Sequence, residues 1–425
     1  MNLVTTLAEM STMIEAATGV LQGVATMTPL QRNERLSAAS GGQVWLKRED
    51  LQPVRSYKLR GAYFLMSQLT TVERAAGVIC ASAGNHGQGV AWSCARLGIN
   101  ARIFIPSTTP RQKRDRMVAL GQGHIELVVG GDTYDDASAL AKTVAAAEGA
   151  TMVPAFDDLR TIAGQGTLAP EIVQQLGAAP DVLLIPVGGG GLLSGLGAWF
   201  RTNYPDTRLI GVEPAGAPSM IRALEQGRPV ALQGIDTFVD GAAVSRAGDL
   251  TLPLVAQVAP EMIAVPEGQV CTEMLDMYQV DGIIAEPAGA LASAAIGGAH
   301  SRAPITIPPG STVVCIVSGG NNDISRYSEV IERSLVYENL KHYFIVNFPQ
   351  EPGALRRFLS EVLGPDDDIS LFEYMKRSDR ETGPAFVGIT LGQAQSLPGL
   401  LARMDASPLE IEKVSHDSPL FRMFV

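Results

Sequence analysis

A series of short apolar runs, followed by glycine-rich turns and helical patterns, constrains the fold of this chain most. The runs carry β-branched residues and lie at residues 77–81, 101–105, 125–129, 181–187, 207–212 and 312–317. Runs of this length and composition are typical of strands. Because strands that alternate with helices pair in parallel sheets with helices on both faces, we expect an α/β fold for this part of the chain.

The pattern changes after Glu338, and 425 residues are in any case too many for one typical core. Strand-like segments at 343–348, 369–375 and 385–391 alternate with helix-like segments at 352–359 and 397–404, and a polar turn lies at 378–383. This β-α-β-β-α order predicts a small ferredoxin-like domain. We therefore expect a first domain over residues 1–328, a connecting helix over 329–340 and a second domain over 341–425.

The formal net charge of −11 argues against nucleic acids and anionic membranes as partners, because both attract basic surfaces. The five histidines and four cysteines are scattered without metal-ligand spacing, so no metal is predicted. Cysteines used in this way suit a reducing compartment, and we interpret them as small buried side chains.

No targeting segment is evident, since the first positively charged residue is Arg32. Residues 182–200 form the longest uncharged stretch and have enough residues to span a bilayer, but Pro186 and four consecutive glycines interrupt it. Such interruptions favour a strand, a loop and a helix. We therefore expect a cytoplasmic protein.

Four segments could take part in binding or catalysis. Each follows a strand or begins a helix, which is where ligands collect in open α/β folds. In residues 186–194 (PVGGGGLLS), the glycines and the helix start give backbone N–H groups that suit a phosphate. The segment lacks the lysine of a P-loop, and Ser194 breaks the G-x-G-x-x-G spacing, so a monophosphate fits better than a dinucleotide. The alternative is a merely flexible turn.

The other three segments are weaker when taken alone. Lys58, in residues 56–62 (SYKLRGA), is either a surface charge or a buried amine whose lowered pKa frees it as a nucleophile. Residues 82–89 (SAGNHGQG) either hold a carboxylate at a helix start or form a capped polar turn with a structural His86. Residues 318–323 (SGGNND) follow an apolar strand and by themselves fit any turn.

Together the four segments resemble the threonine and serine dehydratases among the fold-type II pyridoxal-phosphate enzymes. The match runs in the family's order from residues 28–30 (TPL) and 46–50 (LKRED) to residues 318–321 (SGGN). The resemblance implies two parallel-sheet α/β subdomains with pyridoxal 5′-phosphate between them. The smaller one, roughly residues 59–155, is inserted in the larger.

The resemblance also implies a role for each matched residue. Lys58 bonds covalently to the cofactor and later moves the α-proton, Asn85 hydrogen-bonds the phenolic oxygen, and Ser318 meets the pyridine nitrogen. The cofactor phosphate is held by Gly188, Gly189, Gly190, Gly191 and Leu192. The substrate carboxylate is held by Ser82, Ala83, Gly84, Asn85 and His86. Glu286, in residues 286–290 (EPAGA), lies near the cofactor.

The implied reaction is an elimination. A neutral serine leaves the ring nitrogen largely unprotonated, and the resulting milder electron sink suits loss of the β-hydroxyl with the α-proton. L-Threonine would give 2-oxobutanoate and ammonia, and L-serine would be a secondary substrate. Ala83 stands where racemases of the family carry a serine, so racemisation is not expected. Glu213 matches a residue near the divalent cation of relatives, but Ser219 replaces a later acidic ligand, so no metal is expected there.

Residues 352–355 (PGAL) and the pattern around them resemble the ACT-like regulatory domain of biosynthetic threonine dehydratases. Longer family members carry two such modules, and this chain has room for one. The resemblance implies a homotetramer whose activity is controlled by isoleucine, with valine as a second effector. The alternatives are a module used only for oligomer contacts, a catabolic serine/threonine dehydratase, a threonine synthase and an amino-acid sensor without catalysis.

Overall fold

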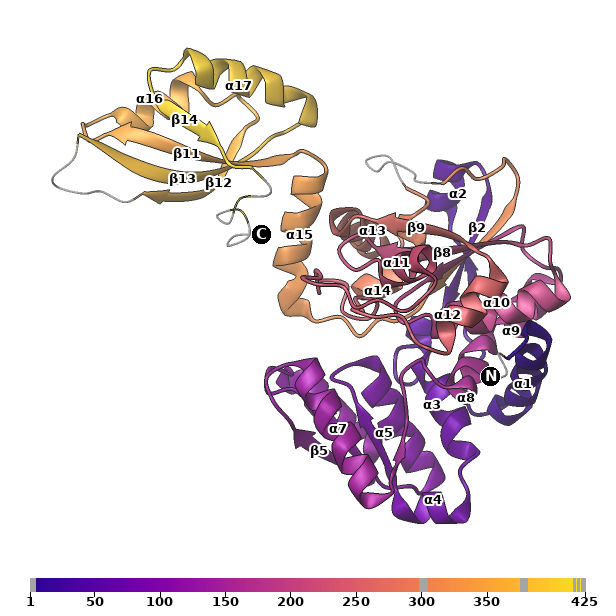
Figure 1. Cartoon of the computed structure of the whole chain (residues 1–425). Helices are drawn as coiled ribbons and strands as arrows, with labels where there is room; N and C mark the ends of the chain where they lie inside the picture. Colours follow the sequence, from indigo (N-terminus) through magenta and orange to yellow (C-terminus); the bar gives the residue numbers. More distant parts are fainter. Residues whose placement is uncertain (1–4, 298–304, 375–380, 416–417, 419–420, 422–425) are drawn as a thin grey trace. The chain divides into compact units, whose positions relative to one another are not determined.

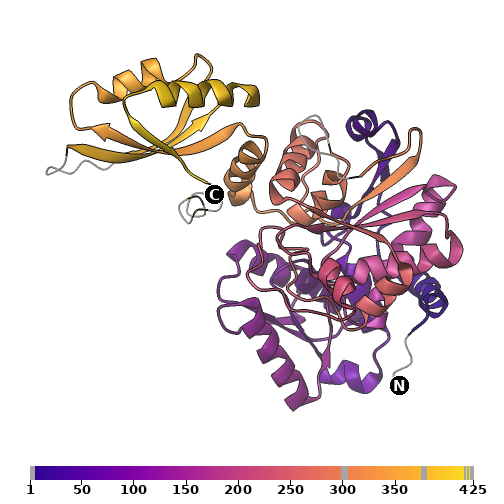
Figure 2. The same ribbon diagram turned by 45° about the horizontal axis from the view of Figure 1, so that its top comes forward.

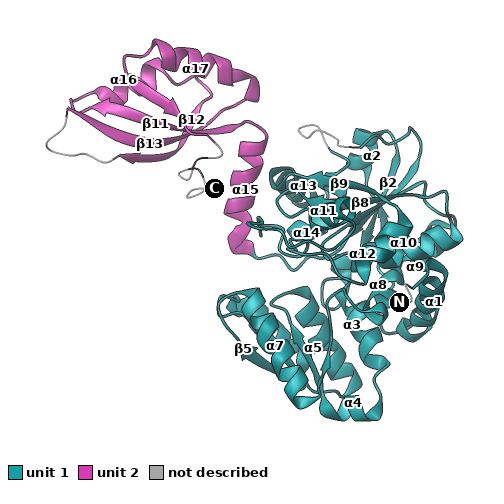
Figure 3. Ribbon diagram, in the orientation of Figure 1, with its two compact units in different colours: residues 1–323 teal, residues 324–425 magenta. Residues whose placement is uncertain are grey.

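The structure is a computed structural model that describes residues 5–297, 305–374, 381–415, 418 and 421. The chain divides into two compact units, residues 1–323 and residues 324–425 (Figure 3). Part of the predicted polar turn at 378–383 lies outside the described residues.

The larger sheet of the first unit has six strands in the order β1-β2-β10-β7-β8-β9. The strands are β1 (Leu30–Arg32), β2 (Gln43–Arg48), β7 (Val182–Pro186), β8 (Arg208–Pro214), β9 (Glu261–Val265) and β10 (Thr312–Val317). All neighbouring pairs are parallel except β1 with β2. The predicted parallel sheet is therefore confirmed, with one antiparallel edge strand that the sequence patterns did not reveal.

The smaller sheet of this unit has four parallel strands in the order β5-β4-β3-β6. These are β3 (Val78–Ala81), β4 (Ala101–Ile105), β5 (Ile125–Val129) and β6 (Thr151–Met152). Because side chains alternate along a strand, Cys80 packs with α3 and α5 on one face, whereas Ile79 packs with α7 on the other. Both faces are thus covered by helices, as expected for a parallel sheet.

The helices of the first unit cover the two sheets (Figure 1). They are α1 (Leu7–Leu21), α2 (Glu34–Ser40), η1 (Glu49–Leu51), α3 (Lys58–Ser67), α4 (Thr71–Ala76), α5 (Asn85–Leu97), α6 (Arg111–Gly121), α7 (Tyr134–Glu148), α8 (Leu159–Gly166), α9 (Leu168–Leu176), α10 (Gly191–Asn203), α11 (Ser219–Gln226), α12 (Thr251–Val258), α13 (Glu267–Gln279) and α14 (Pro287–Ala294). The four cysteines are free and buried, as expected.

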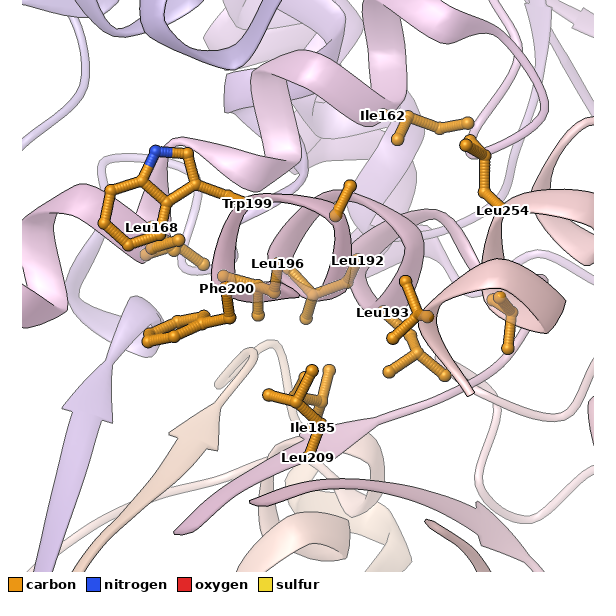
Figure 4. Packing of buried hydrophobic residues seen from close by; sticks show 14 of the residues in the cluster. Ile162, Leu168, Ile185, Leu192, Leu193, Leu196, Trp199, Phe200, Leu209 and Leu254 are labelled. Atoms are coloured by element: carbon orange, nitrogen blue, oxygen red, sulfur yellow. The ribbon is translucent and has the colours of Figure 1, made fainter. Parts of the chain in front are cut away.

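The core of the larger sheet is centred on α10. Ile185 and Leu209 of the sheet pack against this helix from one side, and Ile162 and Leu254 lie on another (Figure 4). Ten consecutive residues, from Gly191 to Phe200, are buried. This packing explains the uncharged stretch at 182–200, which forms β7, a glycine turn and α10. In the part of the chain that the structure describes, no helix has the length and hydropathy needed to cross a membrane.

The second unit has an antiparallel sheet in the order β12-β13-β11-β14, with α16 and α17 on one face (Figure 2). Its elements are η2 (Ile324–Arg326), α15 (Tyr327–Tyr337), β11 (Lys341–Pro349), α16 (Ala354–Glu361), β12 (Asp368–Tyr374), β13 (Thr382–Thr390), η3 (Ala394–Ser396), α17 (Leu397–Ala406) and β14 (Glu410–Lys413). Phe344, Phe358 and Leu400 are part of the core between helices and sheet. The order is β-α-β-β-α-β, so the ferredoxin-like prediction is confirmed and completed by β14.

Candidate active site

All four segments singled out from the sequence contribute to the wall of one cavity in the first unit. It is lined by Tyr57, Lys58, Asn85, Pro186, Gly188, Gly241, Ala242, Glu286, Ala288 and Ser318. These residues are far apart in the sequence, so the cavity exists only in the folded unit.

Lys58 is the first residue of α3, and its Nζ donates to the carbonyl oxygen of Ala155 at 3.1 Å. The same Nζ lies 5.2 Å from the centre of the Tyr57 ring. Among the described residues, no carboxylate forms an ion pair with this amine. A neutral carbonyl holds an amine less strongly than a carboxylate does.

The segments that carry Lys58 and Ser318 are joined by their backbones. The N–H of Tyr57 donates to the carbonyl of Ser318 at 3.1 Å, and the N–H of Gly320 donates to the carbonyl of Arg55 at 2.9 Å. Ser56 and Gly319 form an isolated antiparallel bridge between these bonds. We call this pair of hydrogen bonds the backbone bridge.

The glycine run 188–191 connects β7 to α10, and Gly190 has a φ of 95°, which favours glycine. A Cβ at Gly188 would lie 3.0 Å from the carbonyl oxygen of Ala242, and one at Gly189 would lie 2.4 Å from the Phe156 ring. Within the described chain, no protein acceptor takes the N–H groups of residues 188–192. Free N–H groups at the positive end of a buried helix fit the phosphate of pyridoxal phosphate.

The cavity is also lined by three polar side chains, those of Ser318, Asn85 and Glu286. The Ser318 hydroxyl donates to the carbonyl oxygen of Ala288 at 3.0 Å. The Nδ2 of Asn85, at the start of α5, donates to Oε1 of Glu286 at 2.6 Å. Burial and then the charge of Asp240 raise the pKa of Glu286 to about 7, so near neutral pH this carboxyl is protonated in part of the molecules.

The loop predicted to hold the substrate carboxylate precedes α5, and Asn85 is its one member on the cavity wall. Ser82, Ala83 and Gly84 are half-buried beside it, and the Gly84 N–H donates to the Ser82 hydroxyl at 3.2 Å. The imidazole of His86 is buried, with Nε2 2.7 Å from the carbonyl oxygen of Val153.

Burial, and then the charge of Lys58, lower the pKa of His86 to about 4, so its ring is neutral. The His86 ring is directed into the protein, so only the backbone of His86 could contribute to binding the substrate carboxylate.

Residues 240–242 escaped the sequence analysis, although Gly241 and Ala242 line the cavity. Asp240 pairs with Lys113 of α6 at 2.9 Å, which joins this segment to a helix of the smaller sheet. No strand directly precedes this segment, so it could not be recognised by its position. Ala155 was missed because it acts through its backbone.

Glu213 binds backbone groups at the start of a helix. Its carboxylate accepts the backbone N–H groups of Met220 at 2.7 Å and Ile221 at 2.8 Å, at the start of α11. Burial raises the pKa of Glu213 to about 7 despite these bonds. In the described residues, no group of three or more His, Cys, Asp or Glu side chains could hold a metal ion.

Comparison with known proteins agrees with this geometry. Residues 21–319 match the family model of pyridoxal-phosphate dependent enzymes, and residues 332–424 match that of the C-terminal regulatory domain of threonine dehydratase. The L-threonine dehydratase biosynthetic IlvA of Mycobacterium tuberculosis is 57% identical over 412 residues, which are 96% of this chain and 94% of that protein. The protein of the same name from Bacillus subtilis is 49% identical over 405 residues, 95% of each chain.

A solved structure, the processed form of threonine deaminase isoform 2 from Solanum lycopersicum, has a TM-score of 0.72 at 39% identity. The match covers 77% of this chain and 93% of that one. These findings confirm the predicted fold class, cofactor and enzyme class. The chain belongs to the pyridoxal-phosphate-dependent threonine dehydratases that carry a C-terminal regulatory domain.

Proposed function

We propose that this enzyme converts L-threonine into 2-oxobutanoate and ammonia as the first step of isoleucine biosynthesis, with L-serine as a secondary substrate. The convergence of Lys58, Asn85, Gly188 and Ser318 on one cavity carries this proposal. The relatives named for threonine dehydration, which match nearly the whole chain, support it.

When bound, pyridoxal phosphate supplies an electron sink that makes the α-proton of the amino acid acidic. We assign covalent attachment of the cofactor, and then transfer of the α-proton, to Nζ of Lys58. The Ala155 carbonyl, 3.1 Å away, holds this amine at the cavity until it reacts. Because the carbonyl carries no charge, the amine leaves it at little cost.

The N–H groups of residues 188–192 would hold the cofactor phosphate, and one N–H of Asn85 would meet the phenolic oxygen. Ser318 would meet the ring nitrogen, since its hydroxyl can rotate away from Ala288. A hydroxyl stabilises a protonated ring nitrogen less than a carboxylate does, which suits elimination.

We assign the substrate carboxylate to the loop of residues 82–86, where the start of α5 adds the positive end of a helix dipole. Ala83 has no hydroxyl to return a proton to the α-carbon, so the enzyme should release no D-amino acid. L-Serine fits the same arrangement, because it differs from L-threonine by one methyl group.

We further propose that isoleucine, with valine as a second effector, binds within residues 341–425 of a cytoplasmic homotetramer. Residues 1–328 would then form the catalytic domain, with the smaller subdomain at roughly 59–155. Residues 329–340 would connect the two domains. The match of residues 332–424 to a regulatory domain supports this assignment. An effector changes activity only if it binds two arrangements of the enzyme with different affinity.

A 2-oxo acid release assay with L-threonine, L-serine and phosphohomoserine, each with and without L-isoleucine, tests the proposal. We expect the highest kcat/KM with L-threonine, and a threonine curve that isoleucine shifts. An equal kcat/KM for L-serine would indicate a broad dehydratase. Threonine formed from phosphohomoserine would indicate a synthase.

A further inference from the structure

The side-chain amide of Asn85 is held from both ends. Its Oδ1 accepts a hydrogen bond from Nδ2 of Asn321 at 2.7 Å, and its Nδ2 donates to Oε1 of Glu286 at 2.6 Å. The Nδ2 of Asn321 also donates to the carbonyl oxygen of Val54 at 2.8 Å. Val54, Asn321, Asn85 and Glu286 thus form one continuous chain of hydrogen bonds.

The direction of this chain is fixed at the Val54 end. A backbone carbonyl only accepts, so the atom of Asn321 that faces Val54 must be its amide nitrogen. The same nitrogen faces Asn85, which must therefore present its oxygen. The Asn85 nitrogen is left to face Glu286. Rotating the Asn85 amide by half a turn would place two nitrogens together at one end and two oxygens at the other.

The contact between Asn85 and Glu286 lies close to two glycines. A Cβ at Gly319 would be 2.1 Å from Oε1 of Glu286 and 3.2 Å from Nδ2 of Asn85. A Cβ at Gly241 would be 3.5 Å from that oxygen and 4.0 Å from that nitrogen. Because residues 241 and 319 are glycines, no side chain at these positions displaces the contact between Asn85 and Glu286. Burial raises the pKa of Glu286, and the backbone N–H of Asn321 is one of the groups that oppose the rise.

An amide nitrogen carries two hydrogens, and Glu286 takes one of those on Asn85. The second remains for the cavity, whose wall Asn85 shares with Lys58 and Ser318. We propose that Asn321 is a positioning residue that, through Asn85, keeps this second N–H directed at the ring oxygen of the cofactor. The inference rests on the role given to Asn85 under the proposed function. The alternative is that Asn321 only attaches its own turn to Val54.

The test measures the affinity of the full-length apoenzyme for pyridoxal phosphate and for an analogue that lacks the ring hydroxyl. The ratio of the two affinities isolates the hydrogen bond to that oxygen, because a general weakening of the site affects both ligands alike. A hydrogen bond to a charged oxygen predicts a preference of about tenfold for pyridoxal phosphate in the wild type.

Asn321→Ala should reduce this preference to within about threefold, as should Asn85→Ala. Asn321→Asp keeps the volume of the side chain and provides a second test if the alanine variant does not fold. Its carboxylate accepts only, so Asn85 should turn its oxygen toward the ring oxygen and bring the preference to one or below. The matched control is Asn322→Ala, because Nδ2 of Asn322 donates to Ala285 at 3.0 Å in the same turn. This control should keep the wild-type preference.

Two outcomes separate this inference from the proposed function. If the preference is lost in Asn85→Ala but kept in Asn321→Ala and Asn321→Asp, Asn321 does not position the amide, and the role of Asn85 stands. If the wild type shows no preference, or Asn85→Ala keeps it, the role of Asn85 itself is wrong, and this inference is lost with it.

Discussion

The two units use their sheets differently. In the first, two parallel sheets bring the ends of distant strands to one cavity, and the N–H groups of residues 188–192 have no protein acceptor within the described chain. In the second, one antiparallel sheet packs its core against α16 and α17, and sequence analysis found no catalytic motif there. The residues with a predicted catalytic role therefore lie in short segments of the first unit, whereas no such segment was predicted in the second.

The buried charges differ in the same way. Arg60 of the first unit is fully buried and binds Glu49 and Glu171 with two hydrogen bonds each. In the second unit, the half-buried Glu332 of α15 accepts hydrogen bonds from Lys341 and Tyr343 of β11. The first arrangement joins the three elements η1, α3 and α9, and the second joins α15 to β11. Removing the charged side chain of Arg60 should therefore lower the free energy of unfolding more than removing that of Glu332.

The largest effect is expected at Lys58. Lys58→Ala should abolish threonine deamination and the absorbance of the lysine-bound cofactor, because no other amine lines the cavity in the described structure. Steady-state assays and absorbance spectra of the purified variant check this. Circular dichroism should show an unchanged fold. Appreciable turnover without added amines would contradict the assignment.

Arg60→Leu should lower the free energy of unfolding of the first unit by about 3–5 kcal/mol, because it removes the fully buried guanidinium that pairs with both Glu49 and Glu171 and leaves the buried Glu49 carboxylate without its arginine. Calorimetry measures the unfolding transitions of the two units. Arg222→Ala, which removes an exposed pair with Glu225, is the control and should change the free energy by less than about 0.5 kcal/mol. If both substitutions lowered the free energy of unfolding by the same amount, the buried Arg60 pairs would stabilise the protein no more than the exposed pair of Arg222 and Glu225.

Removal of the residues after Leu340 should leave an enzyme that deaminates threonine but no longer responds to isoleucine. A typical coupling of about 1–3 kcal/mol corresponds to a 5- to 150-fold change in apparent affinity, and the truncated protein should show none. Threonine saturation curves with and without isoleucine measure this. If full-length enzyme gives the same curve at millimolar isoleucine or valine, the second unit serves only assembly.

The smallest effect is expected at Glu286. Its pKa of about 7 in the folded protein lies above the ordinary value of 4.5, so folding favours the protonated form. Stability is therefore lost as the pH rises from about 4.5 to about 7, by at most about 3 kcal/mol. Glu286→Gln removes this loss and keeps an acceptor for Asn85.

Thermal unfolding of the apoenzyme should show a larger gain in Tm from Glu286→Gln at pH 8 than at pH 5. Glu213 titrates in both proteins, so its contribution cancels in the difference. An equal gain at both pH values would show that Glu286 does not ionise in this range.

Much of the site was predictable because it lies in short segments whose chemistry is local. The glycine run before α10 suggested a phosphate site by itself, whereas Lys58 received its role only from the resemblance of all four segments, in order, to a known family. The carbonyl of Ala155 and the contact of Gly241 with the cavity arise only from the fold, and no residue type marks them. In the second unit, β14 (Glu410–Lys413) was missed because charged residues alternate along a short edge strand with one half-buried position, Ile411.

The backbone bridge has a consequence for motion in the cavity. Loops of folded proteins move on the nanosecond to microsecond timescale, and segments joined by peptide hydrogen bonds move together. Lys58 and Ser318 are coupled in this way whatever side chains stand nearby. The hydrogen bonds of the Asn85 amide to Glu286 and Asn321, in contrast, are made by side chains. The backbone therefore sets the separation of the Lys58 and Ser318 segments, whereas the orientation of the Asn85 amide depends on the side chains around it.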